Sequence, residues 1–170
     1  LIHPAAYLRR QATSDVREED WDAQMSVNLK ASFFLARNCG DIMKKQGKGG
    51  RIILFTSGAW IMGSAMGDTS MGADVYTASK GGVVSLVRSF AKTYGRHNIL
   101  VNAVAPGQVN TPMQHVGLEP GVSEEMSKAC PLGRVSEPEE QASVAVFLAS
   151  DHASFINNSV INVSGGILGY

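Results

Sequence analysis

The chain has 170 residues, 44% of them hydrophobic, and its 15 basic and 15 acidic residues give a formal net charge of zero. That length and composition suit one domain with a sizeable core. The balanced charge offers no basic run for nucleic acid, and no uncharged stretch reaches the roughly 18 residues that span a membrane. Cys39 and Cys130 lie far apart and outside any metal-ligand spacing, so we expect two reduced thiols in a cytoplasmic protein with no metal site.

The first part of the chain predicts a strand and a long helix. Leu1-Ile2 has the character of the end of a buried strand, and a polar loop follows it. Ser14 or Asp15 is expected to cap a helix over residues 15–46, because the acidic first turn suits the positive end of a helix. Apolar residues then recur at helical spacing, at Val27, Ala31, Phe34, Leu35 and Ile42.

The middle of the chain predicts a strand, a loop and a second helix. The apolar run 52–55 is typical of a strand that is covered on both faces. Residues 58–74 show no period, and loops of that length in a compact domain are usually functional or mobile. A helix over residues 74–95 carries an apolar stripe made of Val83, Leu86, Val87, Phe90 and Tyr94.

The last part of the chain predicts a strand over 98–104, a helix over 137–149 and a strand over 158–164. Strands that alternate with helices indicate an α/β fold with a parallel sheet. Ligands of such sheets bind outside the carboxyl ends of the strands. That rule selects Ser57 with its loop, the loop after 98–104, and the glycines that follow the last strand.

Tyr76 and Lys80 are the first candidates for chemistry. They lie four residues apart at the start of a predicted helix, so they share a face. A nearby ammonium lowers the pKa of a phenol, which brings it toward the range where acid–base catalysis is efficient. Ser57 ends a strand nearby and is suited to hold the same substrate oxygen. By itself, so short a pattern more often marks a surface Tyr and a solvated Lys.

Five segments, in this order, resemble the short-chain dehydrogenase/reductase family over essentially the whole chain. They are "DWDAQMSVNLKASFFLAR", "GRIILFTS", "YTASKGG", "ILVNAVAPGQVNTPM" and "GRVSEPEEQASVAVFLASDHASFINNSVINVSGG". The resemblance implies an α/β fold, a Rossmann-like doubly wound parallel sheet with helices on both faces. It also implies that residues 1–170 form a single partial domain, from the end of the family's fourth strand to its C-terminus, with the N-terminal βα units absent.

The resemblance assigns roles residue by residue. Tyr76 would exchange a proton with the substrate oxygen, Lys80 would lower the Tyr76 pKa and bind the nicotinamide ribose, and Ser57 would orient the substrate oxygen. Asn28 would hold a water that links Lys80 to solvent; an internal hydrogen bond of the helix is the alternative. The residues that would wrap the nicotinamide and phosphate of NAD or NADP are Pro106, Gly107, Val109 and Thr111.

The chain departs from the family pattern in its loop 58–74, which makes Ser57 and Tyr76 19 residues apart. We hypothesise that this loop forms an adaptable apolar wall of the substrate pocket; a surface insert is the alternative. The residues that would form the wall are Trp60, Ile61, Met62, Met66 and Met71.

Two other departures concern the front of the chain. His3-Pro4-Ala5-Ala6 stands where the family has "NNAG", and we expect His3 to be a satisfied loop residue. No Gly-rich turn that would seat a pyrophosphate at a helix N-terminus occurs in this sequence. We therefore expect weak NAD(P)H binding, or none, by the 170-residue chain alone.

By the resemblance, the expected function is NAD(P)-dependent interconversion of a secondary alcohol and a ketone. The alternative is a truncated, inactive remnant that acts as a binding or oligomerisation module. Residues 7–37 are similar to sugar-acid dehydrogenases and 3-oxoacyl reductases within the family. A homodimer or homotetramer through helices 15–46 and 74–95 is implied, although the apolar faces of these helices equally suit covering the sheet.

Overall fold

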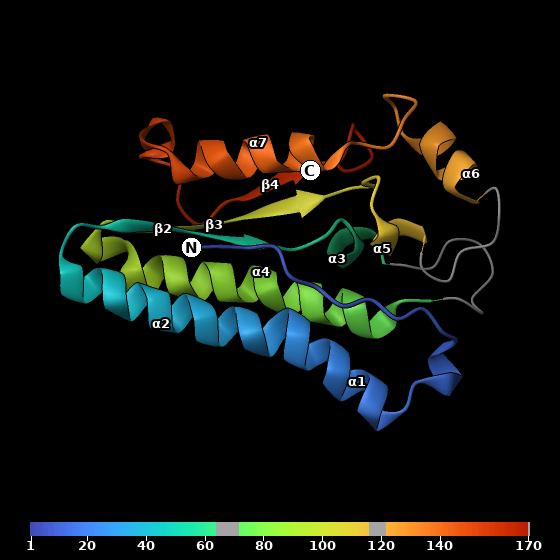
Figure 1. Cartoon of the computed structure of the whole chain (residues 1–170), viewed down its shortest axis with the longest axis horizontal. Helices are drawn as coiled ribbons and strands as arrows, with labels where there is room; N and C mark the ends of the chain where they lie inside the picture. The colour runs from blue at the N-terminus through green and yellow to red at the C-terminus, as the bar shows by residue number, and fades with distance from the viewer. Residues whose placement is uncertain (64–71, 116–121, 170) are drawn as a thin grey trace.

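A computed structural model describes residues 1–63, 72–115 and 122–169 (Figure 1). Its sheet has four parallel strands in the order β1 (Ile2–His3), β2 (Gly50–Phe55), β3 (Ile99–Pro106) and β4 (Val160–Val163). Each of the four predicted strands is present, shifted by a residue or two at its ends. All are paired in parallel, as alternating strands and helices require.

Helices cover both faces of the sheet, which confirms the Rossmann-like doubly wound fold (Figure 1). One layer holds α1 (Glu18–Met25), η2 (Ser26–Lys30), α2 (Ala31–Gln46) and α4 (Asp74–Tyr94). The other holds α7 (Pro138–Ala149). The short elements are η1 (Thr13–Asp15), α3 (Ala59–Met62), η4 (Gly95–His97), α5 (Pro112–His115), α6 (Val122–Ala129) and η5 (Asp151–Ala153).

The core lies on both faces of β2 and β3. Ile52 and Leu54 face the α4 layer, where they join the buried side chains of that helix. Ile53 faces the opposite way and packs with Ala145 and Leu148 of α7. Successive residues of a strand point to opposite faces, so a continuous apolar run is what a strand covered on both faces needs.

The helix predicted over 15–46 begins later than expected. Its first residue is Glu18 and its N-cap is Arg17, which makes no side-chain capping bond. Ser14 and Asp15 belong instead to the separate turn η1, so the predicted cap was wrong. The acidic first turn is present, and a π-helical turn, η2, joins α1 to α2 without a break.

The apolar stripe predicted on this long helix faces outward. Phe34, Leu35 and Ile42 are exposed by 40%, 41% and 56%. The buried face repeats every four residues and is small or polar, consisting of Asp20, Gln24, Asn28, Ser32, Ala36 and Gly40. Small residues let α2 approach α4 closely, since a Cβ at Gly40 would stand 2.5 Å from the ring of Tyr94.

Within the described residues, no helix has both the length and the apolar character that crossing a membrane requires. Cys39 and Cys130 are both free thiols, as predicted. The same part of the chain holds no group of three or more metal-ligating side chains.

Candidate active site

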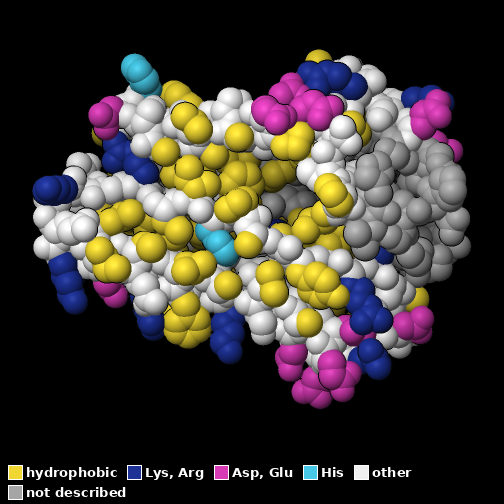
Figure 2. All heavy atoms as spheres, in the orientation of Figure 1, with side chains coloured by type: hydrophobic (Ala, Val, Ile, Leu, Met, Phe, Trp, Pro, Cys, Tyr) yellow, Lys and Arg dark blue, Asp and Glu magenta, His cyan; other side chains and the backbone are white. Residues whose placement is uncertain are grey.

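A cavity of about 580 Å³ opens at the carboxyl ends of β1, β2 and β3. In Figure 2 the surface is hollowed between the two helix layers, and hydrophobic side chains surround the opening. Seven of the eight residues predicted for the site line this cavity, and Asn28 does not. The seven are Ser57, Tyr76, Lys80, Pro106, Gly107, Val109 and Thr111.

Tyr76 and Lys80 both lie in the first turns of α4, on the face that meets the strand ends. The Lys80 ammonium is 5.6 Å from the centre of the Tyr76 ring and donates a 2.8 Å hydrogen bond to the carbonyl of Phe55. Lys80 is only 2% exposed, and this burial lowers its pKa to about 8. It is therefore a buried amine, and the ordinary reading of a solvated surface lysine does not apply.

The pKa of Tyr76 is raised, because burial disfavours the phenolate. A hydrogen bond with Ser57 and the positive charge of Arg10 act against that rise without cancelling it. The sequence had predicted a lowered pKa with Lys80 as the cause. In the structure the direction is the opposite, and the charge of Arg10 is the cationic influence that opposes the rise in the Tyr76 pKa.

Ser57 lies two residues after the end of β2 and is held by the turn that it starts. Its hydroxyl accepts a 3.2 Å hydrogen bond from the Ala59 amide. The preceding Thr56 donates its hydroxyl to the Lys80 carbonyl at 2.8 Å, which fixes the strand end to α4. This local arrangement brings Ser57 to Tyr76 in spite of the long segment between them.

Asn28 is fully buried in η2, and its side chain forms hydrogen bonds with the chain segment after β1. Its side chain accepts a 2.7 Å bond from the Tyr7 amide and donates to the Tyr7 carbonyl at 2.9 Å. It also donates to the Ser79 hydroxyl at 3.0 Å. The side-chain amide thus ties the segment after β1 to both long helices, so its bonds are not the internal helix bond that was the alternative. The water that Asn28 was predicted to hold stays a prediction.

His3 is not the satisfied loop residue that the sequence predicted. It lies in β1, and its buried Nε2 has no hydrogen-bond partner within the described residues. Its pKa is lowered, first by burial and then by the nearby charge of Lys80. The imidazole at the end of β1 thus lies near enough to Lys80 for the lysine charge to lower its pKa.

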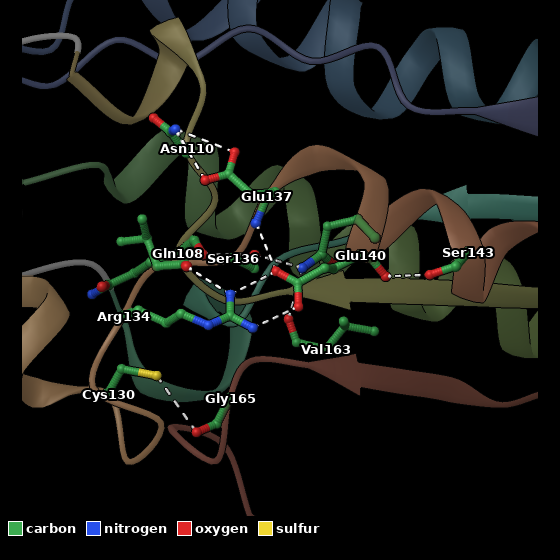
Figure 3. Close-up of polar contacts among 12 residues, drawn as sticks. Gln108, Asn110, Cys130, Arg134, Ser136, Glu137, Glu140, Ser143, Val163 and Gly165 are labelled. Carbon is green, nitrogen blue, oxygen red and sulfur yellow. Dashed lines mark hydrogen bonds and ion pairs between the residues drawn. The ribbon is translucent and has the colours of Figure 1, made fainter.

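The loop after β3 is held in shape by its neighbours (Figure 3). The Ser136 amide and hydroxyl both donate to the Gln108 carbonyl, at 3.0 and 2.9 Å, and the Asn110 amide donates to the Ser136 carbonyl at 2.8 Å. Gly107 is needed for packing, since a Cβ there would stand 2.8 Å from the Cα of Ser164. The cavity wall at this loop is thus a rigid one.

A capping network at the start of α7 supports the same loop (Figure 3). Arg134 forms two bonds to the Glu140 carboxylate, at 2.7 and 2.8 Å, and Glu140 also accepts the Glu137 amide. Arg134 is the main cause that lowers the pKa of Glu140 to about 2. Gln141 then donates to the Ser136 hydroxyl at 2.9 Å, which links the helix to the loop.

The apolar wall predicted from residues 58–74 is not present in the described residues. Trp60, Ile61 and Met62 belong to α3 or its end and do not line the cavity. Met66 and Met71 lie outside the residues that the structure describes. The apolar lining comes instead from residues such as Leu8, Met113 and Ala145.

A family model described as Enoyl-(Acyl carrier protein) reductase matches residues 1–168. Over 160 residues the chain is 42% identical to a short-chain dehydrogenase/reductase of Armillaria gallica, covering 91% of this chain and 59% of that protein. The chain belongs to the short-chain dehydrogenase/reductase family.

Two other short-chain dehydrogenase/reductases match nearly the whole chain. A 3-oxoacyl-[acyl-carrier-protein] reductase of Thermotoga maritima is 39% identical over 168 residues, 99% of this chain and 65% of its own. A 2-dehydro-3-deoxy-D-gluconate 5-dehydrogenase of Dickeya dadantii is 36% identical over 169 residues, 99% of this chain and 64% of its own. The chain thus spans less than two thirds of the length of these relatives.

The cavity of this short-chain dehydrogenase/reductase fits the nicotinamide end of a dinucleotide. The four residues predicted to hold that group share one cavity with Ser57, Tyr76 and Lys80, within the volume range of small-molecule sites. An ammonium has three donors, and in the described part of the chain the Phe55 carbonyl accepts from Lys80. A ribose hydroxyl is a suitable acceptor for another of these buried donors.

Arg10 was not predicted from the sequence, although it lines the same cavity. Arg9-Arg10 has the composition of a solvated pair, and nothing in the local pattern separates the two residues. Alternation along an extended chain would have been the available signal, since it sends neighbouring side chains in opposite directions.

Proposed function

We propose that this chain carries the catalytic part of an NAD- or NADP-dependent oxidoreductase that interconverts a secondary alcohol and a ketone. One observation carries the proposal. Ser57, Tyr76 and Lys80 line a single cavity, with Ser57 hydrogen-bonded to Tyr76 and the Lys80 ammonium beside the Tyr76 ring.

In ketone reduction, the bound cofactor supplies a hydride to the carbonyl carbon. The Tyr76 hydroxyl gives its proton to the carbonyl oxygen and becomes a phenolate, while Ser57 donates a hydrogen bond to the same oxygen. The Lys80 ammonium stabilises the phenolate, because a nearby positive charge favours the ionised form. Alcohol oxidation follows the same steps in reverse.

Asn28 takes part in this chemistry through its main chain. Its side-chain amide is engaged by Tyr7 and Ser79, so a water that connects Lys80 to solvent would be held by the Asn28 carbonyl. A carbonyl oxygen has two lone pairs, and that of Asn28 accepts the Ser32 hydroxyl at 2.6 Å.

For the cofactor, we propose that Pro106, Gly107, Val109 and Thr111 hold the nicotinamide and its phosphate, with Lys80 on the ribose. The hydrogen bonds that fix the loop after β3 support this role, because a rigid wall needs no ordering when the ligand binds. For the substrate, the names of the relatives favour the ketone of a 3-oxoacyl compound or of a sugar acid.

Ketone reduction, followed by NADH and NADPH absorbance, tests the proposal with the chain expressed alone and within the full reading frame that encodes it. Tyr76→Phe is expected to lower turnover at least about 100-fold without changing the melting temperature, since it removes the proton donor alone. Tyr7→Phe is the matched control, because the Tyr7 side chain is exposed. Turnover that survives in Tyr76→Phe would contradict the proposal.

We also propose that the chain forms a homodimer or homotetramer through its long helices. The outward stripe of α2 is apolar. A second groove of about 570 Å³ lies between the continuous helix α1–η2–α2 and α4, and it is lined in part by Leu29, Phe33 and Leu86. Burial of this surface by a second copy would remove it from water.

Sedimentation velocity tests the assembly. Phe34→Glu is expected to shift the protein toward the monomer, because it places a charge in the apolar stripe. Phe155→Glu is the control, since Phe155 is fully exposed, whereas Phe34 is 40% exposed, and it lies near η5, away from these helices. Equal sedimentation of the two variants would refute an interface on α2.

A further inference from the structure

His3 is a titratable residue that the proposed mechanism does not use. It lies in β1 and is half-buried, and its buried Nε2 has no hydrogen-bond partner in the described part of the chain. A buried polar atom without a partner has lost its hydrogen bonds to water, and native proteins leave few such atoms unsatisfied. The side of the sheet that His3 faces limits which group can approach this nitrogen.

The pairing of β1 with β2 places His3 on the side of the sheet that faces α4. His3 pairs with Leu54, and Ile2 pairs with Ile53. Paired residues of neighbouring strands point to the same face of a sheet. Leu54 belongs to the core on the α4 side, whereas Ile53 packs with α7. The imidazole therefore shares its face of the sheet with Lys80.

The Lys80 ammonium meets the sheet on the β1 side of β2. The Ile53 amide donates to the Leu1 carbonyl at 2.8 Å, so the N–H and C=O of Ile53 face β1. In an extended strand the peptide groups of every second residue face the same neighbour, so the Phe55 carbonyl faces that side as well. Lys80 donates to this carbonyl at 2.8 Å, and Phe55 is one residue beyond the one that pairs with His3. The ammonium is thus held close to the end of β1.

The protonation states of the two side chains suit a hydrogen bond from Lys80 to His3. Burial is the main cause that lowers the pKa of His3, and the Lys80 charge lowers it further. The pKa of Lys80 is about 8, so a neutral imidazole and a charged ammonium coexist near neutral pH. The ammonium has three donors, of which the Phe55 carbonyl takes one and the proposed ribose contact a second. A neutral imidazole has one nitrogen that accepts a hydrogen bond.

We propose that His3 is a positioning residue for Lys80, whose ammonium donates its third hydrogen bond to a water that in turn donates to the Nε2 of His3. This inference rests on the proposed oxidoreductase function, in which the ammonium stabilises the Tyr76 phenolate. The bridging water and its acceptor favour the charged form of Lys80 and hold it beside the Tyr76 ring. A water has two hydrogens to donate, so this contact is compatible with the water proposed at the Asn28 carbonyl.

His3 has a competing role, which is to repel Lys80 when the imidazole is protonated. That role acts only below the pKa of His3, because a neutral imidazole carries no charge. The proposed hydrogen bond acts above that pKa, where Nε2 has its lone pair. The tautomer of the neutral ring separates the two roles, because the nitrogen that accepts a hydrogen bond is the one without a proton.

Nitrogen NMR of histidine-labelled protein at pH 7.5, without cofactor, reports the tautomer and does not depend on turnover. The spectrum of His3→Gln identifies the His3 signals among the four histidines. His3 is expected to carry its proton on Nδ1 in the wild type, and in Lys80→Met to return to the Nε2–H form that an imidazole in water prefers. Lys45→Met is the control, because Lys45 is exposed on α2. A proton on Nε2 in the wild type, or the same tautomer in Lys80→Met, would overturn the contact.

The pH profile of kcat/KM for alcohol oxidation tests the consequence, within the full reading frame that encodes the chain. The probe is the better of ethyl 3-hydroxybutyrate and gluconate. His3→Leu is expected to lower kcat/KM about 10-fold and to lose activity at a lower pH than the wild type, because the ammonium gives up its proton more readily. His3→Gln should recover most of the loss, since its side-chain oxygen reaches as far as Nε2 and accepts a hydrogen bond.

His97→Leu is the matched control for the kinetics, because His97 is exposed in η4, beyond the far end of α4 from Tyr76. Equal loss in His3→Leu and His3→Gln, or no loss in either, would overturn the positioning role. If the wild type has the Nδ1–H tautomer but oxidises neither alcohol, the His3 contact stands while the proposed reaction finds no support. Oxidation by a wild type that keeps the proton on Nε2 would give the reverse result.

Discussion

Lys80 makes the stability of this protein depend on pH in a direction that can be worked out. Its pKa is 10.5 in an ordinary setting and about 8 in the fold, because the ammonium is buried. Between these values the unfolded chain binds more protons than the folded chain, so the free energy of unfolding rises with pH. Integrated from pH 7 to pH 10, this linkage amounts to roughly 2.5 kcal/mol.

The assay is urea unfolding at pH 7, 8, 9 and 10, followed by the fluorescence of the two tryptophans. Lys80→Met removes the titrating group, so the difference in unfolding free energy between wild type and Lys80→Met should grow by that amount in favour of wild type. Lys45→Met is the control, because Lys45 is exposed on α2. A difference that stays constant from pH 7 to pH 10 would show that the Lys80 ammonium is not desolvated.

Two further predictions concern packing and the segment after β1. Gly40→Ala should lower the free energy of unfolding by about 1–3 kcal/mol, because the added methyl group overpacks against the Tyr94 ring. Gly81→Ala is the control and should not destabilise the protein, since its added methyl group meets open space. Chemical denaturation measures both variants, and equal stability of the two would refute the close contact at Gly40. Asn28→Ala removes three hydrogen bonds and should lower the free energy of unfolding by about 2–4 kcal/mol. Asn38→Ala is the control and should leave the free energy of unfolding nearly unchanged, because the Asn38 side chain is exposed. Faster amide hydrogen exchange at residues 5–11 in Asn28→Ala would accompany that loss, and unchanged exchange there would contradict it.

The local sequence pattern was enough to predict the helices and strands. The apolar run of β2 needs a helix on each face, and α4 and α7 supply them. Four of the five residues of the α4 stripe are buried as its spacing predicts, and Leu86 is half-buried. For α2 the same rule left open which face is buried, and in the structure the apolar stripe faces outward while a small and polar face packs inward. Periodicity reports that a helix has two faces, and the neighbouring elements decide which of them is buried.

Some properties of the candidate site could likewise be predicted from the sequence, and others could not. The motifs predicted Ser57, Tyr76 and Lys80, and the structure places these three in one cavity with the loop after β3. The direction of the Tyr76 pKa was not predictable, because it depends on the burial of the phenol and on Arg10, which lies 66 positions earlier in the chain. Desolvation and long-range charge have no signature in a local pattern.

The sequence by itself determined the family, the alternation of strands and helices, and the residues suited to proton transfer, because these depend on residue type and on spacing within one element. Only the tertiary structure decided that Lys80 is a buried amine, that Asn28 fastens the segment after β1, and that Arg10 enters the cavity while Arg9 does not. These properties follow from distances between segments far apart in the chain, which folding sets and neighbouring residues do not encode.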